Sequence, residues 1–341
     1  MTSRELVKAT LEFRNTDGRV PRDLWTLLWP HLFEKEELDA IMEKYVWDIG
    51  EPEVVYAKQS PVKKGVWERA GEYVDDWGCI FANVQDGIIG EVKQPIVPAE
   101  DEDWEDISAI HIPEELLTFD VDVVNESCRK SDKFMLAGAF PRPFEQLQFI
   151  RGTENLYVDL MMRPEGLMRF MEQMHDFYCR LLTKWAETEV DGLRFFDDWG
   201  TQNSLLINPT LWRELFKPMY KDYIDIAHAH GKKIFMHSDG YILDILPDLV
   251  EMGLDAVNCQ IFCMGTEKLA PFKGKIAFWG EICRQHILPY GTTEDVENAV
   301  RSVYETLWDN GGCIAQCEYG IGAKPENVDA VYDAWVRIHG K

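Results

Sequence analysis

The sequence predicts a single-domain (β/α)8 barrel, an α/β fold, with an N-terminal elaboration and an acidic insertion. Three observations predict it: a length of 341 residues, six short apolar segments that alternate with helical patterns, and the lack of a GxGxxG or GxxxxGK[ST] loop. Strands that alternate with helices run parallel, because each crossover returns the chain to the same end of the sheet. We expect residues 1–130 to hold the elaboration and the first strands, and residues 131–341 the main repeats.

The expected strands are short apolar runs that end in small or polar residues. Their ranges are 133–140, 192–197, 233–237, 256–260, 276–279 and 313–317. A barrel needs two more strands. We expect them within residues 53–92, where VVYAK, WGCIFA and GIIGEV are candidates.

The helices between these strands are recognised by their ends. A long amphipathic pattern follows Pro164 and predicts a helix before the second of these strands. Asn208-Pro209 predicts the start of the next helix, as an N-cap followed by proline in the first turn, and Gly231 predicts its end.

The chain is strongly acidic, with a formal net charge of −25. Such a charge repels nucleic-acid phosphates and anionic membrane surfaces, so neither is expected as a partner. The N-terminus lacks the apolar core of a signal peptide, and no run of about 18 apolar residues predicts a membrane span. We therefore expect a cytoplasmic protein. The eight cysteines have no framework spacing and are expected to be reduced thiols.

Eleven acidic residues lie between Glu100 and Glu126, and no Lys or Arg lies between Lys93 and Arg129. A charge run of this kind is typical of a solvated, loop-rich insertion. The alternative is a docking surface for a partner protein. In neither case is this segment expected to carry the chemistry.

In a parallel barrel the reactive groups lie at the C-terminal ends of the strands, so polar residues there are the first candidates. His237 and Asp239 are two residues apart, so in extended backbone both side chains point to one side. Glu281 and Cys317 end two other strands. His, Asp, Glu and Cys are the side chains that bind zinc, which predicts a metal site. The same spacing also fits a hydrogen-bonded His–Asp pair that orients a loop, beside a buried Cys without metal.

Asp197 and Asp198 are candidates for acid–base catalysis, together with Asp239. Adjacent residues at a strand end face opposite ways, so one of the pair is expected to enter the site and the other to cap the following helix. Further side chains near the barrel mouth are expected to contact a flat substrate. They are Trp199, Gln202, Gln260, Trp279 and Tyr319.

The sequence resembles the uroporphyrinogen decarboxylase superfamily over nearly its whole length. The segments that carry the resemblance are RVPRDLW (19–25), ERAGEYVDDWG (68–78), FEQLQFIRGTENLYVDL (144–160), DDWGTQ (197–202), FMHSDGYILDILPDLVEMGLDAVN (235–258), FWGEI (278–282) and CEYGIGAKPENV (317–328). Together they are specific for the superfamily, although each alone is weak. The closer likeness is to the cobalamin-dependent methyltransferases that serve methanol, methylamines and aryl methyl ethers.

This resemblance implies a zinc site, because those methyltransferases carry an H-x-C motif and a distant Cys as zinc ligands. His237 falls on the His of the motif and Cys317 on the distant Cys. Asp239 stands in place of the middle Cys, and Glu281 stands where many relatives have Gly. The resemblance thus implies that His237, Asp239, Glu281 and Cys317 surround the metal.

The porphyrinogen decarboxylases of the superfamily bind a polycarboxylate through an arginine-rich segment. The corresponding ERAGEY keeps Arg69 and Tyr73 as substrate contacts. Glu68 and Glu72 in the same segment would repel a polycarboxylate. The resemblance therefore favours the methyltransferase branch.

The activity implied is zinc-dependent transfer of a methyl group from a small methylated compound, above all a methoxylated aromatic, to the cobalt of a corrinoid (cobalamin) carried by a partner protein. Two carboxylates donate less charge than thiolates, leaving zinc a stronger Lewis acid, which suits polarising an ether oxygen. The alternatives are a decarboxylase of a smaller substrate, a methylcorrinoid:thiol methyltransferase and a non-catalytic binding module. A homodimer is compatible with the resemblance.

Overall fold

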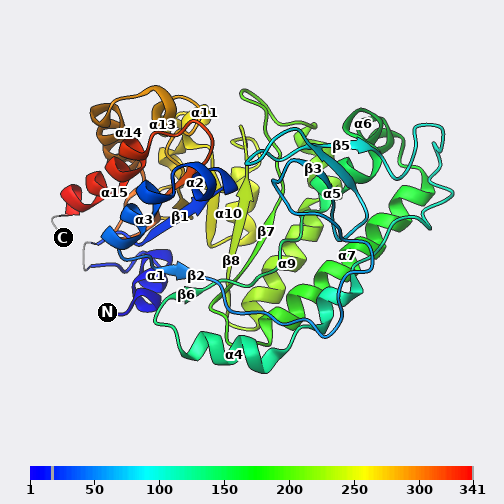
Figure 1. Ribbon diagram of the computed structural model, residues 1–341, viewed down its shortest axis with the longest axis horizontal. Helices are drawn as coiled ribbons and strands as arrows, with labels where there is room; N and C mark the ends of the chain where they lie inside the picture. The colour runs from blue at the N-terminus through cyan, green and yellow to red at the C-terminus, as the bar shows by residue number, and fades with distance from the viewer. Residues whose placement is uncertain (17–18, 340–341) are drawn as a thin grey trace.

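The structure, a computed structural model, describes residues 1–16 and 19–339. Within these residues, eight parallel strands form the centre of the fold (Figure 1). They are β1 (Arg22–Thr26), β2 (Ile49–Gly50), β6 (Phe134–Met135), β7 (Gly192–Phe196), β8 (Lys233–Ser238), β9 (Ala256–Cys259), β10 (Ala277–Trp279) and β11 (Cys313–Tyr319).

Hydrogen bonds close these strands into a ring. Six strands form a continuous sheet in the order β1-β11-β10-β9-β8-β7, and β2 pairs with β6. A parallel bridge between Leu136 and Gly192 joins β6 to β7. The Asp48 amide donates to the Arg22 carbonyl at 2.9 Å, which joins β2 to β1. The predicted (β/α)8 barrel is confirmed.

Helices cover the outside of the ring and fill the connections between its strands (Figure 1). They are α1 (Ser3–Leu11), α2 (Leu28–Phe33), α3 (Lys35–Lys44), η1 (Glu114–Thr118), α4 (Val121–Arg129), α5 (Pro143–Arg151), α6 (Thr153–Met162), α7 (Glu165–Ala186), α8 (Pro209–Leu215), α9 (Lys217–Ala229), α10 (Leu246–Met252), α11 (Ile261–Met264), α12 (Thr266–Leu269), η2 (Ala270–Phe272), α13 (Ile287–Tyr290), α14 (Thr293–Leu307) and α15 (Pro325–His339).

The barrel interior is a separate apolar cluster. Val7 and Leu11 of α1 pack there with Phe134, Phe235 and Ile314, which lie in the early or middle parts of their strands. Helix α1 therefore closes the N-terminal end of the barrel. The opposite end, where strands finish, is left for the polar residues that follow them.

All six strands predicted in the second half are confirmed, but the two predicted upstream are wrong. WGCIFA and GIIGEV contribute to a separate antiparallel sheet of β3 (Gly71–Val74), β4 (Ile80–Asn83) and β5 (Glu91–Gln94), and VVYAK makes only an isolated bridge. The true barrel strands are β1 and β2. Their sequences, RDLWT and the two-residue IG, offer no apolar run for a pattern to detect.

The helix predicted from Pro209 to Gly231 is interrupted at Phe216, between α8 and α9. Pro218 lies in the first turn of α9. Proline has no amide hydrogen and clashes with the preceding turn, so a continuous helix cannot pass through it.

The acidic segment is only partly solvated. Trp104 is fully buried and its Nε1 donates to Asp159 Oδ2 at 2.7 Å, while Glu114 forms an ion pair with Arg180 at 2.6 Å. The segment is therefore anchored against α6 and α7. Among the described residues, no helix is both long and apolar enough to cross a bilayer, and all eight cysteines are free thiols.

Candidate metal centre

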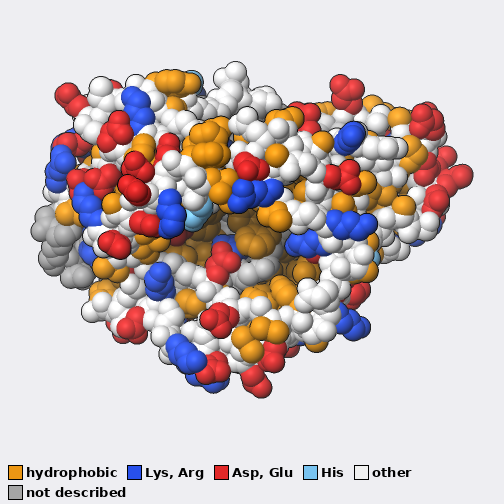
Figure 2. All heavy atoms as spheres, in the orientation of Figure 1, with side chains coloured by type: hydrophobic (Ala, Val, Ile, Leu, Met, Phe, Trp, Pro, Cys, Tyr) orange, Lys and Arg blue, Asp and Glu red, His pale blue; other side chains and the backbone are white. Residues whose placement is uncertain are grey.

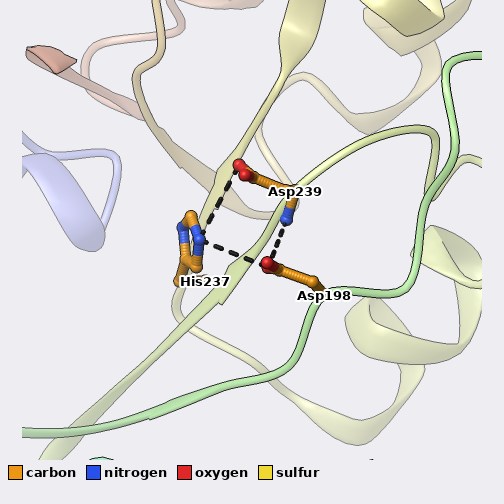
Figure 3. Close-up of side chains that lie close together, drawn as sticks. All are labelled: Asp198, His237 and Asp239. Atoms are coloured by element: carbon orange, nitrogen blue, oxygen red, sulfur yellow. Dashed lines mark hydrogen bonds and ion pairs between the residues drawn. The ribbon is translucent and has the colours of Figure 1, made fainter. Parts of the chain in front are cut away.

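Three side chains meet at the C-terminal ends of β7 and β8 (Figure 3). His237 lies near the end of β8, Asp239 lies just beyond it, and Asp198 lies two residues after β7. Their ligand atoms all lie within 4.8 Å of one another. His237 Nε2 is 3.4 Å from Asp198 Oδ1 and 3.7 Å from Asp239 Oδ1. His237 and Asp239 thus point to the same side of the chain, as predicted, and Asp198 is the third residue of the cluster.

Two glycines let the loops after β7 and β8 come into contact. The Gly200 amide donates to the Asp239 carbonyl at 3.0 Å. A Cβ on Gly200 would lie 2.1 Å from the Tyr241 amide nitrogen, and a Cβ on Gly240 would lie 2.1 Å from the Gly200 carbonyl oxygen. Gly240 also has φ +76°, which disfavours other residues. The glycines of DDWG and HSDG therefore allow Asp198 and Asp239 to converge.

Gly240→Ala should separate these loops, because the new methyl group meets backbone atoms that cannot rotate away. We expect the free energy of unfolding to fall by about 2 kcal/mol or more. Urea unfolding followed by circular dichroism measures this loss. Gly231→Ala is the matched control, because Gly231 also has positive φ but its Cβ would meet nothing within 4 Å. Equal losses in the two variants would show that backbone conformation, and not loop contact, sets the cost.

An amide holds the His237 ring in one orientation. His237 Nδ1 lies 2.6 Å from Asn258 Oδ1. The Asn258 amide nitrogen donates to Gln316 Oε1 at 3.1 Å and to the Trp279 carbonyl, so its oxygen is left to accept from the imidazole. Asn258 therefore keeps a proton on Nδ1, and Nε2 faces Asp198 and Asp239, where it can bind a metal once its own proton has left. Metal-binding histidines are oriented by an oxygen acceptor in this way.

Asn258→Ala should lower metal affinity about 10- to 100-fold, because the imidazole loses the acceptor that fixes its tautomer. Competition with a chromophoric zinc chelator measures the change. Cys259→Ala is the matched control, since Cys259 is the next residue of β9 and packs in the layer between strands and helices. If the Asn258→Ala variant binds zinc as tightly as the unchanged protein, Asn258 does not orient His237 for metal binding.

Arg284 links the cluster to two further carboxylates of this region. It pairs with Asp239 Oδ2, with Glu281 Oε1 at 3.5 Å and with Glu318 Oε2 at 2.8 Å. Asp239 Oδ1 and Glu281 Oε2 are buried and have no hydrogen-bond partner among the described residues. A buried carboxylate oxygen without a donor is costly. One imidazole nitrogen with such oxygens around it is a donor set that fits a divalent cation.

The ionisation of these groups is strongly perturbed. Burial lowers the pKa of His237, but the hydrogen bond and charge of Asp198, with the charge of Asp239, outweigh it and raise the pKa to about 9. Burial raises the pKa of Glu281 to about 8 against the opposing charge of Arg284. Burial also raises the pKa of Glu145, beside the cluster, to about 7. Such perturbed groups gathered at a barrel mouth are typical of a functional site.

The structure does not bring Cys317 to this cluster. On β11, Gln316 and Glu318 face the barrel interior and Arg284, so Cys317 between them faces outward. Its Sγ lies 3.5 Å from the Tyr332 hydroxyl on α15, and burial raises the pKa of the Cys317 thiol to about 12. Of the four ligands predicted, His237 and Asp239 meet directly, and Glu281 reaches the region through Arg284.

The two adjacent aspartates have separate surroundings. Asp198 enters the cluster. Asp197 is fully buried and accepts from the amides of Phe144 at 3.1 Å and Glu145 at 2.8 Å, in the first turn of α5. Burial raises the pKa of Asp197 well above its usual range. The predicted division of roles is present, but the helix capped is α5, which precedes Asp197, and not the helix that follows it.

One of the expected substrate contacts lies next to the cluster, and another lies in the barrel interior. Gln260 Oε1 accepts from the Gly240 amide at 3.2 Å, and Gln260 lines a small pocket with Glu281 and Arg284. Trp279 lies in the barrel interior, where its Nε1 donates to Asp23 Oδ2 at 2.9 Å.

The remaining expected contacts lie elsewhere. Trp199 and Tyr319 are fully buried in the layer between strands and helices, and Tyr73 packs in the antiparallel sheet. Arg69 pairs with Asp86 at 2.9 Å on the surface, and Gln202 is exposed on the loop after β7. Among the described residues, none of these five side chains forms a hydrogen bond or an ion pair with Asp198, His237 or Asp239.

Sequence reasoning missed the aromatic neighbours of His237. The rings of Trp25 and Phe196 lie 5.1 Å and 5.2 Å from the imidazole, centroid to centroid. Phe196 is the last residue of β7 and could have been found as the residue opposite His237 in a parallel pair. Trp25 belongs to the strand that the apolar pattern did not reveal.

Comparison with protein families matches the Uroporphyrinogen decarboxylase (URO-D) family over residues 84–337. Among solved structures, a methyltransferase from Methanosarcina mazei is 14% identical, with 99% of each chain covered and a TM-score of 0.65. A B12-independent methionine synthase from Shewanella sp. W3-18-1 is 11% identical, with 95% of this chain and 96% of that chain covered and a TM-score of 0.45. No curated protein matches the chain.

Proposed function

Because the chain belongs to the uroporphyrinogen decarboxylase family, we propose that it is a zinc-dependent methyltransferase built on that family's barrel. It takes the methyl group of a small methoxylated aromatic and passes it to the cobalt of a corrinoid on a separate protein. The observation that carries the proposal is the convergence of Asp198, His237 and Asp239 at the barrel mouth. The Methanosarcina mazei methyltransferase supports it by sharing the fold across the whole chain.

The cluster suits a metal that activates oxygen. His237 supplies Nε2, and Asp198 and Asp239 supply one carboxylate oxygen each. Bound zinc would act as a Lewis acid that draws electron density from an ether oxygen and makes its methyl carbon easier to attack. The cluster itself contains no cysteine, so its donors carry no thiolate charge to weaken that acidity. This favours the methyl-donor side of the reaction over activation of a thiol acceptor.

The aromatic residues beside the cluster position a flat substrate. Trp25 and Phe196 lie 5.9 Å apart, centroid to centroid, and both flank His237. An aromatic ring placed against them gains offset or edge contacts and excludes water from the ether oxygen. Arg142 packs on the Phe196 ring at 5.9 Å and pairs with Glu145 at 3.4 Å. These two contacts restrain the position of the Phe196 ring.

The test has two parts. Protein made with zinc available should contain about one zinc per chain, and with a reduced corrinoid protein it should form methylcobalamin from an aryl methyl ether. Chelation should abolish this activity. Full activity after chelation, with release of carbon dioxide from a small acid, would establish a metal-free decarboxylase instead. Methyl transfer only to a thiol would reverse the proposed direction.

A further inference from the structure

A buried arginine lies in the barrel outside the metal cluster. Arg194 of β7 is 5% exposed, and it faces the interior because its neighbours Leu193 and Phe195 pack in the layer between strands and helices. Its Nε has no hydrogen-bond partner among the described residues. Its ion pair with Glu51 Oε1, at 2.5 Å, is made to a side chain that is 52% exposed.

A buried guanidinium normally has its donors satisfied, since each unpaired donor carries a desolvation cost. Arg194 cannot leave the barrel, whereas Glu51, at the end of β2, can turn into solvent. The carboxylate of Glu51 therefore occupies a place that another carboxylate could take in exchange. A ligand carboxylate would bind the planar guanidinium through two parallel hydrogen bonds.

An aromatic wall connects Arg194 with the metal cluster. The Arg194 guanidinium lies 4.2 Å from the ring of Phe140 and 5.8 Å from the ring of Phe196, and Phe196 is 5.2 Å from His237. Phe140 is 41% exposed, so this row of aromatic rings, Phe140 and Phe196, extends to the protein surface. Figure 2 shows one face of the molecule, which is hollowed near its middle, with hydrophobic side chains inside the hollow and charged ones around it.

The pairing of β7 with β8 sets the distance along the strands between Arg194 and His237. Phe196 is opposite His237 and Arg194 is opposite Phe235, two residues earlier. The two levels therefore differ by about 6.6 Å along the strands. A benzoate with a para substituent spans a similar length, from its carboxylate to its ether oxygen.

We propose that Arg194 anchors the carboxylate of an aromatic substrate whose ring packs on Phe196 and Trp25 and whose ether oxygen faces His237. The inference rests on the proposed function and adds that the substrate is an anion. The net charge of −25 repels anions in general. A fixed cation inside the barrel would let this one site bind a monocarboxylate in spite of that repulsion. Glu51 competes with the substrate for this cation.

The probes are 4-methoxybenzoate and its neutral amide, 4-methoxybenzamide, titrated calorimetrically into zinc-loaded protein without corrinoid. The acid should bind more tightly than the amide. Arg194→Met, which keeps the side-chain length, should weaken the acid about 10- to 100-fold and the amide by less than about twofold. Glu51→Gln should strengthen binding of the acid several-fold, because it removes the competing charge. It alters an exposed side chain, so it tests the inference even if Arg194→Met fails to fold.

Arg69→Gln is the matched control, since the sequence predicted Arg69 as one of several substrate contacts and the structure pairs it with Asp86. It should leave both affinities unchanged. Equal binding of acid and amide, loss of acid binding in Arg69→Gln alone, or weaker acid binding in Glu51→Gln would overturn the role of Arg194. The proposed function survives such results if methyl transfer from neutral ethers persists. If the acid binds selectively but no methyl transfer occurs, the role of Arg194 is supported and the proposed methyltransferase function is contradicted.

Discussion

Replacing His237 by alanine is expected to reduce bound zinc from about one per chain to almost none and to lower methyl transfer more than about 1,000-fold. His237 supplies the nitrogen donor, and its Nε2 lies within 3.7 Å of both aspartate oxygens. Without it the site keeps only carboxylates, which bind zinc poorly alone. Metal analysis of purified protein and a corrinoid methylation assay measure the two losses.

Cys317→Ala is the informative companion of this variant. Its thiol contacts the Tyr332 hydroxyl on α15, outside the barrel interior, so zinc content should stay near one per chain. Stability should fall modestly, by about 1 kcal/mol, from the lost packing. Zinc retained by His237→Ala and lost by Cys317→Ala would contradict the assignment of the centre to the β7–β8 cluster.

The second large effect concerns stability. Asp197→Ala is expected to lower the free energy of unfolding by roughly 3–5 kcal/mol. Helix α5 has no side-chain cap of its own, and the Asp197 carboxylate accepts from two amides in its first turn and from the Tyr220 hydroxyl. The substitution leaves all three donors buried and unpaired.

The neighbouring residue serves as the control for Asp197→Ala. Asp198→Ala removes a carboxylate that accepts one hydrogen bond, from the Asp239 amide at 2.9 Å, so it should lower zinc affinity and reduce stability by only about 1 kcal/mol. Chemical unfolding and chelator competition on both variants separate the two roles. Similar losses of stability in both variants would show that the pair acts as one structural unit.

Much of the fold was predictable because six strands carry apolar runs and their helices carry clear ends. The upstream strands were missed for a physical reason. β1 contains Arg22 and Asp23, and β2 has two residues, so neither buries a continuous apolar run. The segment that does read as strands, residues 77–92, instead pairs in the antiparallel sheet β3-β4-β5.

The candidate site was predictable where local geometry determines it. The alternation of His237 and Asp239 places both on one side of the chain, and no distant information is needed. The orientation of Cys317 is different. β11 is buried on both faces, so its sequence shows no alternation from which the inward face can be read. Arg284 and Asn258 reach the cluster through tertiary contacts that no local pattern encodes.

The central claim is that the metal is held by an imidazole and carboxylate oxygens without sulfur. X-ray absorption at the zinc edge of the loaded protein tests it most directly. The predicted spectrum contains only nitrogen and oxygen neighbours, at about 2.0–2.2 Å. A sulfur neighbour at about 2.3 Å would contradict it, because a thiolate would then have to enter the site from a residue that the structure places elsewhere.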